Sequence, residues 1–215
     1  MNPPTKKRIL QSFLILSVIG LFFSLYLLDN HYRSPAEGAI CDFGKTFSCS
    51  LVNTSVFSEI LNVSVALLGV LWFVVLFAIS WKALKSDGAS VTLLFGWNVL
   101  GIISVAYFVI AEYLLRALCL FCTVVHIIVV ITFILSFRLY RAEGLSIKDR
   151  AFRKTSRRWI VWLLVLTVFL FIIFNYPVGK EGNYDALAQC VTEKGVSMYS
   201  SFRCGVCAKT RAMFG

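Results

Sequence analysis

The chain has 215 residues, of which 59% are hydrophobic and 15% charged, and its mean hydropathy of +0.81 excludes an ordinary soluble domain. A net charge of +10 is compatible with a nucleic-acid partner, but Lys and Arg gather in alternate segments between apolar runs. We therefore interpret the positive charge as a topology signal and a contact with the lipid bilayer, and expect no nucleic-acid partner.

Long apolar runs predict membrane-spanning helices. Five such runs occur, at residues 9–28, 60–80, 90–111, 117–137 and 159–176. Each is close to the length of roughly 20 residues that crosses the hydrocarbon core of a bilayer. The first run follows three basic residues like a secretion signal, but it is too long for one and is expected to be an anchor. The sequence thus predicts an all-α membrane protein with five transmembrane helices.

The loops predict the orientation of these helices. Eight basic residues lie between positions 138 and 158, whereas the loop at 29–59 carries only Arg33 and Lys45. The positive-inside rule places the N-terminus and the basic loop in the cytoplasm, so the expected location is the cell (inner) membrane. All seven cysteines then fall on the extracytoplasmic side or at its boundary, where disulfides persist.

The long loop at 29–59 contains Cys41 and Cys49 and is rich in Ser, Asn and Thr. Residues 52–60 are expected to form a short amphipathic segment in the membrane interface. The spacing of the two cysteines fits a static disulfide that braces the loop. It fits equally a pair that exchanges electrons with a partner and with other thiols.

The fourth apolar run opens with a C-x-x-C pair, Cys119 and Cys122, followed by His126. Spacings of i, i+3 and i+7 place the three on one helix face, with His126 about 10 Å deeper than Cys119. This pattern predicts a redox pair at the membrane surface, with a polar group lining a pocket beneath it. The alternative is two small apolar side chains and a histidine bonded to a neighbouring helix. Asn98 in the third run is expected to face either a pocket or only a neighbouring helix. Glu112, directly after that run, is expected at the membrane interface.

The tail at 177–215 has a different character. Residues 184–194 have helical periodicity, residues 196–199 are typical of a strand, and Cys204-Gly205-Val206-Cys207 then opens a helix. A strand, a turn and C-x-x-C at a helix N-terminus indicate the beginning of a thioredoxin-like module. Because eight residues follow Cys207, we expect only part of such a module. Cys190 has no assigned role.

A metal site is the competing interpretation of these thiols. Cys119, Cys122, Cys204 and Cys207 are the right number to bind zinc, which would make the chain a non-enzymatic metal-binding membrane protein. One pair lies at a membrane surface and the other in a soluble context, so the sequence favours redox chemistry without a metal.

Three segments resemble the vitamin K epoxide reductase (VKOR) family, in its prokaryotic form fused to a thioredoxin-like module. They are the loop from Cys41 to SLVNTS at 50–55, VALLG at 65–69, and CLFCTVVH at 119–126. Cys204-Gly205-Val206-Cys207 resembles the fused module, although Arg203 stands where such motifs usually have Trp. The resemblance divides the chain into a four-helix domain (1–140), a basic cytoplasmic loop (141–158), a fifth helix (159–176) and an extracytoplasmic partial thioredoxin-like segment (177–215).

The resemblance implies a bundle around a quinone of the ubiquinone, menaquinone or phylloquinone type. Cys122 would react with the quinone, Cys119 would exchange with Cys49, and Cys41 would exchange with Cys204 of the Cys204/Cys207 pair. His126 and, more loosely, Asn98 would contact the quinone. The expected partners are a thioredoxin-like protein or the chain's own C-terminal module, and secreted or periplasmic proteins that receive disulfides. An alternative is that reduction of a quinone or of vitamin K epoxide is the physiological output. The position of the cysteine pair at the start of the fourth apolar run favours this family over the four-helix quinone reductases of the DsbB type.

Overall fold

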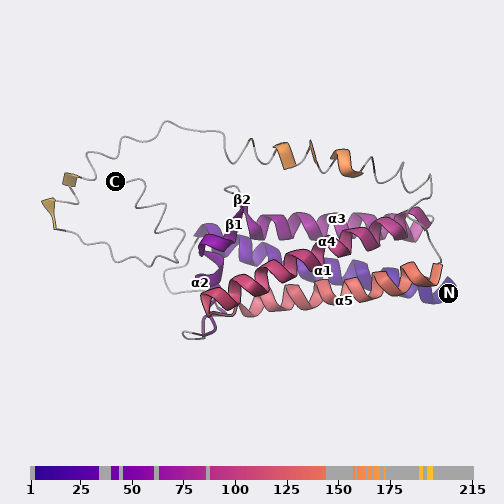
Figure 1. The fold of residues 1–215 in the computed structure, drawn as a ribbon, viewed down its shortest axis with the longest axis horizontal. Helices are drawn as coiled ribbons and strands as arrows, with labels where there is room; N and C mark the ends of the chain where they lie inside the picture. Colours follow the sequence, from indigo (N-terminus) through magenta and orange to yellow (C-terminus); the bar gives the residue numbers. More distant parts are fainter. Residues whose placement is uncertain are drawn as a thin grey trace.

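Four long helices lie side by side in the computed structural model, which describes residues 3–33, 40–43, 46–60, 63–85, 88–143 and part of the positions between 157 and 195 (Figure 1). Each of the four is long and apolar enough to cross a membrane. Their bounds are Pro3–Arg33 (α1), Val65–Lys85 (α3), Gly88–Leu115 (α4) and Leu120–Glu143 (α5). The prediction of an all-α protein with a four-helix transmembrane bundle is confirmed.

The predicted fifth span is described only in part. An apolar helix, Trp159–Phe169, is shorter than the other four. Most of the basic loop at 141–158, the end of the predicted span and nearly all of the tail, including Cys204 and Cys207, lie outside the described residues. The fifth helix and the thioredoxin-like segment therefore stay predictions.

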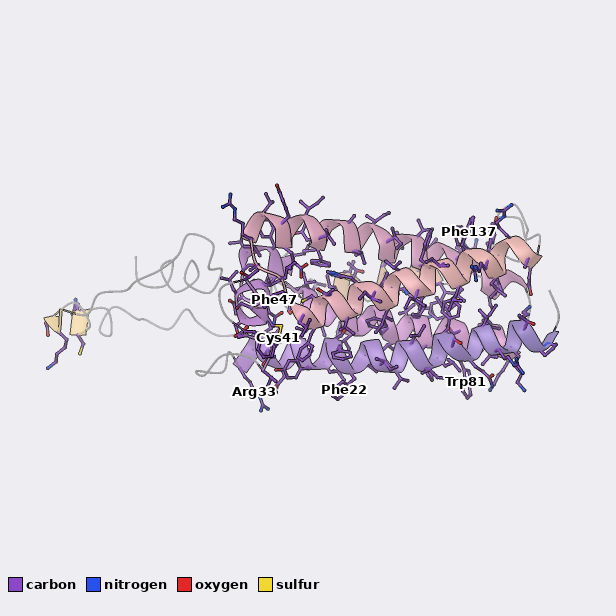
Figure 2. The ribbon with its side chains drawn as sticks, turned by 90° about the horizontal axis from the view of Figure 1, so that it is seen from below. Phe22, Arg33, Cys41, Phe47, Trp81 and Phe137 are labelled. Atoms are coloured by element: carbon purple, nitrogen blue, oxygen red, sulfur yellow. A yellow bond between two sulfur atoms is a disulfide. The ribbon has the colours of Figure 1, made fainter. Side chains whose placement is uncertain are left out.

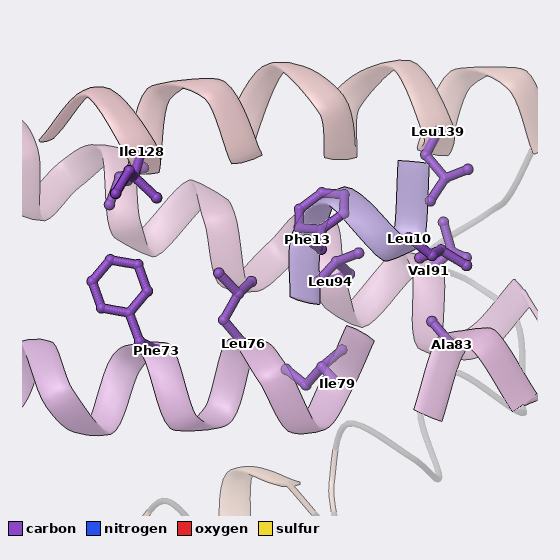
Figure 3. Close-up of a cluster of buried hydrophobic side chains, with 11 residues drawn as sticks. Leu10, Phe13, Phe73, Leu76, Ile79, Ala83, Val91, Leu94, Ile128 and Leu139 are labelled. Carbon is purple, nitrogen blue, oxygen red and sulfur yellow. The ribbon is translucent and has the colours of Figure 1, made fainter. Parts of the chain in front are cut away.

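The bundle is packed along its length by one apolar cluster to which all four helices contribute (Figure 3). Its buried members are Leu10, Phe13, Phe73, Leu76, Ile79, Ala83, Val91, Leu94, Ile128, Val129 and Leu139. Gly20 of α1 permits the closest approach, because the ring of Phe73 occupies the space that a Cβ at this position would take. Buried hydroxyls such as those of Ser80 and Ser136 donate to carbonyls of their own helices, which satisfies them without water.

The turn between α4 and α5 differs from the predicted loop at 112–116. Helix α4 continues to Leu115 and ends at Arg116, whose φ of 54° is left-handed. The N–H of Ala117 donates to the carbonyl of Glu112 and the N–H of Arg116 to that of Tyr113, at 3.3 and 3.2 Å. This is a Schellman ending with arginine where glycine is usual. This ending keeps Glu112 inside the last turn of α4, so the helix sets the direction of the Glu112 side chain.

Short elements close one end of the bundle, opposite the N-terminus (Figure 1). They are helix α2 (Cys49–Asn53), a 3-10 turn η1 (Val56–Ser58), and an antiparallel hairpin of β1 (Glu59–Ile60) and β2 (Val63–Ser64). The predicted amphipathic segment at 52–60 is thus divided among three elements, and its position relative to the interface stays a prediction.

The two ends of the bundle differ in chemistry. Cys41, Phe47 and Arg33 lie at one end, and Trp81 and Phe137 lie toward the other (Figure 2). At that other end, the Lys6 ammonium pairs with the Glu143 carboxylate at 2.5 Å, which joins the start of α1 to the end of α5. The basic ends of α3 and α5 and the sulfur atoms of Cys41, Cys49, Cys119 and Cys122 therefore lie at opposite ends of the bundle.

Candidate active site

The loop cysteines form a disulfide at the start of α2. Cys41 and Cys49 have Cα atoms 5.8 Å apart, and each is 1% exposed. Ser48 caps α2, because its hydroxyl accepts a backbone N–H of the first turn at 3.1 Å. The carboxylate of Asp42 accepts the N–H of Ser50 at 3.1 Å, which holds the two sides of the disulfide together. The bond is thus well supported, a property that both a brace and an exchange pair require.

Cys119 and Cys122 are thiols at the start of α5. Cys119 lies one residue before the helix, and its Sγ accepts the backbone N–H of Cys122 at 3.2 Å. Its carbonyl also accepts the N–H and the hydroxyl of Thr123, each at 2.9 Å. The side chain of Cys119 therefore caps the helix and satisfies one of the N–H groups that a helix start leaves open. The two sulfurs lie on one helix turn, although only Cys122 belongs to the helix itself.

A backbone clamp brings the loop disulfide to this pair. The N–H of Leu118 donates to the carbonyl of Thr46 at 2.8 Å, and the N–H of Ser48 donates to the carbonyl of Leu118 at 3.1 Å. Phe47, in the loop at 29–59, thus forms a parallel bridge with Leu118, the residue before Cys119. The sequence contains no signal for this pairing, because a single bridged residue has no periodicity.

The result is one buried sulfur cluster. Cys41, Cys49 and Cys119 share it with Leu27 of α1, and Cys122 packs against its side. Cys119 is fully buried, whereas Cys122 is partly exposed. The predicted proximity of the loop pair and the C-x-x-C pair is therefore present, with Cys119 on the side of the disulfide.

Cys122 also faces a cavity of about 220 Å³ inside the bundle. Helices α1, α3, α4 and α5 form its walls, and residues from α2 and η1 cover its outer end. The walls are mainly apolar and aromatic, with contributions from Leu68, Trp72, Phe73, Val105, Phe108, Val125 and Val129. A mainly apolar cavity with few polar groups is typical of a site for an apolar small molecule or cofactor.

His126 lines the same cavity one turn below Cys122. Its ring is stacked on that of Phe108, with centroids 6.1 Å apart and planes at 9°. The stacking fixes the plane of the imidazole. The structure thus places His126 and Cys122, but not Cys119, in the lining of one cavity.

Trp72 is a further residue of the cavity wall. Its indole Nε1 is buried and has no hydrogen-bond partner, while the residue itself lines the cavity wall. Trp97 stacks on Trp72 at 6.3 Å and donates its own Nε1–H to the Trp72 carbonyl at 3.2 Å. A Cβ at Gly101 would lie 2.7 Å from the Trp72 ring, so only glycine lets α4 approach the indole this closely. The sequence interpretation missed Trp72, since an apolar run hides which indole faces inward.

Glu112 is a second residue that the sequence interpretation placed differently. It was expected at the membrane interface, but its side chain is 5% exposed and lines the cavity. Its Oε1 accepts the backbone N–H of Cys119 at 3.3 Å. Glu112 stands seven residues before Cys119 in the sequence, but this spacing brings the two residues together only because of the way in which the α4–α5 turn folds.

The cover of the cavity is tied to the end of α1. The Asn53 amide donates to the carbonyl of Leu27 at 2.6 Å, and His31 Nδ1 donates to the carbonyl of Asn53 at 2.7 Å. His31 Nε2 lies 3.3 Å from the Glu59 carboxylate. This network fixes α2 and β1 over the cavity and next to the disulfide.

Other predicted residues are not brought to the site. Asn98 is fully buried and donates its amide to the carbonyl of Leu94 at 2.8 Å, and it is not among the residues that line the cavity. A contact between Asn98 and quinone stays a prediction. Cys190 is a free, exposed thiol, and the Cys204/Cys207 pair lies outside the described residues.

A metal centre was the competing interpretation of the thiols. Within the part of the chain that the structure describes, no three or more His, Cys, Asp or Glu side chains are arranged to hold a metal ion. The four-thiolate arrangement with Cys204 and Cys207 is not tested by this finding, because it includes residues beyond that part.

Comparison with known proteins identifies the family of the chain. A sequence model of the vitamin K epoxide reductase family matches residues 12–137, which is more than half of the chain and contains all four long helices in large part. No curated protein matches the chain. Proteins of this family are membrane oxidoreductases that use quinones in general.

Proposed function

Because the chain belongs to the vitamin K epoxide reductase family, we propose that it is a quinone-dependent thiol oxidoreductase that forms disulfides for extracytoplasmic protein folding. One observation carries the proposal. The Cys119/Cys122 pair contacts the loop disulfide on one side, while Cys122 faces an apolar cavity on the other. This is the position required of a relay between aqueous thiols and a lipid-soluble acceptor.

The electron route follows from the order of the sulfurs. Thiols of a partner, either a thioredoxin-like protein or the chain's own Cys204/Cys207 pair, reduce the Cys41–Cys49 disulfide by exchange. The Cys49 thiolate then attacks the Cys119–Cys122 disulfide at Cys119, with Cys122 as the leaving thiolate. Attack by Cys41 on Cys49 restores the loop disulfide and leaves the C-x-x-C pair reduced. The backbone N–H groups at the start of α5 partly neutralise the negative charge on the exchanging sulfurs.

The cavity suits a quinone ring on several grounds. Its walls are mainly apolar and aromatic, and the few polar groups include the His126 ring; Trp72 also lies in the wall, and its buried Nε1–H has no hydrogen-bond partner in the described part of the chain. A buried donor without a partner is costly, so a carbonyl acceptor at this place would satisfy it. When bound, a quinone supplies an acceptor for two electrons and two protons. Trp72, His126 and Phe108 would hold and orient it next to Cys122.

The orientation and location are part of the proposal. The basic helix ends lie opposite the cysteines, and the positive-inside rule assigns those basic ends to the cytoplasm. We infer that the protein resides in the cell (inner) membrane, with its N-terminus cytoplasmic and its cysteines outside. Secreted or periplasmic proteins would then be the final thiol donors.

The proposed function is tested with the full chain in lipid nanodiscs. A small dithiol is supplied with ubiquinone, menaquinone or phylloquinone, and hydroquinone formation is followed by absorbance while disulfides are mapped by mass spectrometry. We expect one hydroquinone per dithiol oxidised, with Cys119–Cys122 and Cys41–Cys49 bonds and mixed Cys49–Cys119 bonds in partly reduced samples. Absence of reduction with all three quinones, together with stoichiometric bound zinc or copper, would favour the metal-binding alternative.

Replacement of Trp72 by phenylalanine tests the assignment of the cavity. The ring volume is nearly kept while the N–H is lost, so KM for quinone should rise about 3- to 10-fold, the usual effect of one hydrogen bond. The kcat should change little, because the sulfurs are not disturbed. Trp81→Phe is the matched control, since Trp81 is exposed near the other end of the bundle. An unchanged KM in Trp72→Phe would remove Trp72 from the quinone site.

A further inference from the structure

The position of Glu112 is not accounted for by the relay of sulfurs. Its carboxylate is buried in the last turn of α4, lines the cavity together with Cys122, and accepts the N–H of Cys119. It thus touches both the cysteine pair and the proposed quinone site. Among the described residues, no Lys or Arg forms an ion pair with it.

A carboxyl group in this place is expensive. Acidic side chains within a membrane-spanning helix are costly and mark proton or substrate pathways when they face a cavity. Support of the Cys119 backbone requires only one acceptor oxygen, which a neutral glutamine would provide equally well. Support alone therefore does not explain why an ionisable group stands here.

The reaction creates a need for a proton carrier at this point. Formation of the Cys119–Cys122 bond breaks two S–H bonds and releases two electrons and two protons. Under the proposed function, on which this inference rests, quinone accepts the two electrons and becomes hydroquinone only when it also receives two protons. Both transfers take place in a buried region, where water cannot deliver protons freely.

We infer that Glu112 is a proton carrier of the reaction: it takes the proton of one thiol of the cysteine pair as the disulfide forms and releases it to the quinone in the cavity, while the second proton passes directly from the other thiol to the quinone. The exchange of protons between sulfur and a carboxylate is general acid–base catalysis by a group within reach of both donor and acceptor. The carboxylate regenerates when the proton leaves, so no further reactant is required.

Few other groups compete for this role. The titratable side chains that share the sulfur cluster or the cavity with Glu112 are Cys119 and Cys122 at the start of α5 and His126 one turn deeper. The cavity-facing residues of α1 are Ser24 and Leu27, and α3 adds none that titrates. Glu112 is therefore the carboxyl group of the site, at the level of the sulfurs.

The decisive variant is Glu112→Gln in the full chain in nanodiscs, with a quinone on which the wild type is active. Glutamine keeps an acceptor for the Cys119 N–H but cannot carry a proton. We expect kcat for quinone reduction to fall about 10²-fold, with a changed pH profile and little change in KM. Oxidation of the Cys119/Cys122 pair by a small soluble disulfide, which brings its own proton acceptor, should proceed at the wild-type rate.

Glu143→Gln is the matched control. Glu143 pairs with Lys6 at the far end of the bundle, so the same chemical change there should leave quinone reduction unaltered. Wild-type protein without activity toward quinone would contradict the proposed function itself. An active wild type with an equally active Glu112→Gln variant would overturn only the inference about Glu112.

A second measurement does not depend on activity. In quinone-free wild type oxidised with ferricyanide, which accepts electrons but no proton, one of the two released protons should remain on Glu112 when the disulfide forms. Infrared difference spectra between dithiol and disulfide states should then show a carboxylic acid band that shifts with ¹³C-labelled glutamate and disappears in Glu112→Gln. If the variant fails to fold, the labelled wild type still decides. Absence of the band, or equal loss of both oxidation rates in the variant, would make Glu112 a positioning residue and overturn the inference.

Discussion

Replacement of Cys122 by alanine is expected to abolish quinone reduction, with a loss of about 10³-fold or more, as is usual when a reacting nucleophile is removed. Cys122 is the cysteine of the pair that lines the cavity, whereas Cys119 is fully buried on the side of the loop disulfide. Loss of Cys122 also leaves Cys119 without its partner. Cys119 should then accumulate in a mixed disulfide with Cys49, visible by mass spectrometry under non-reducing conditions.

Cys190→Ala is the control for this variant. Cys190 is also a free cysteine, but it is exposed and belongs to neither the sulfur cluster nor the cavity. It should retain wild-type turnover and the wild-type disulfide pattern. Turnover unchanged in Cys122→Ala would exclude the proposed transfer of electrons from this sulfur.

Replacement of Cys49 by alanine is expected to have the second-largest effect, because it distinguishes an exchanging pair from a brace. If Cys49 carries electrons, steady-state oxidation of a thioredoxin-like substrate should fall at least about 10²-fold. A single turnover from pre-reduced Cys119 and Cys122 to quinone should survive. Stopped-flow absorbance of the quinone measures both rates on one sample.

The companion variant Cys41→Ala removes the same disulfide and any bracing that it provides, an effect of roughly 2 to 4 kcal/mol on the free energy of unfolding. It leaves Cys49 free beside Cys119, so a stable Cys49–Cys119 bond should accumulate. Two variants that lose stability equally, yet keep turnover per folded molecule, would identify the Cys41–Cys49 bond as a brace alone.

The helices could be predicted because lipid imposes a simple requirement. Apolar length alone predicted four spans that the structure contains, and within the bundle Cys41, Cys49, Cys119 and Cys122 lie together at one end. The predicted spans were too short at several ends, since polar residues such as Arg33 and Lys85 continue the helices beyond the apolar core. Hydropathy measures the contact with lipid and does not measure where hydrogen bonding stops.

The site was predictable where it depends on helix geometry and not where it depends on tertiary contacts. Cys122 and His126 line one cavity because both belong to α5 at a spacing that keeps them on one face. The clamp between Phe47 and Leu118, and the inward faces of Trp72 and Glu112, depend on how loops and neighbouring helices meet. Asn98 illustrates the opposite case, because this polar residue of an apolar run donates to a carbonyl of its own helix and lies outside the cavity lining.

The pairing of the loop at 29–59 with Leu118 has a consequence for the rate of thiol–disulfide exchange. Two hydrogen bonds keep the segment that carries Cys49 beside the segment that carries Cys119, so their encounter does not wait for diffusion. Exchange between the Cys49 thiolate and the Cys119–Cys122 disulfide becomes a unimolecular step with a high effective molarity. The slow step of the cycle should then be the arrival of a soluble partner. Turnover should therefore vary with the concentration of that partner more strongly than with the concentration of quinone in the membrane.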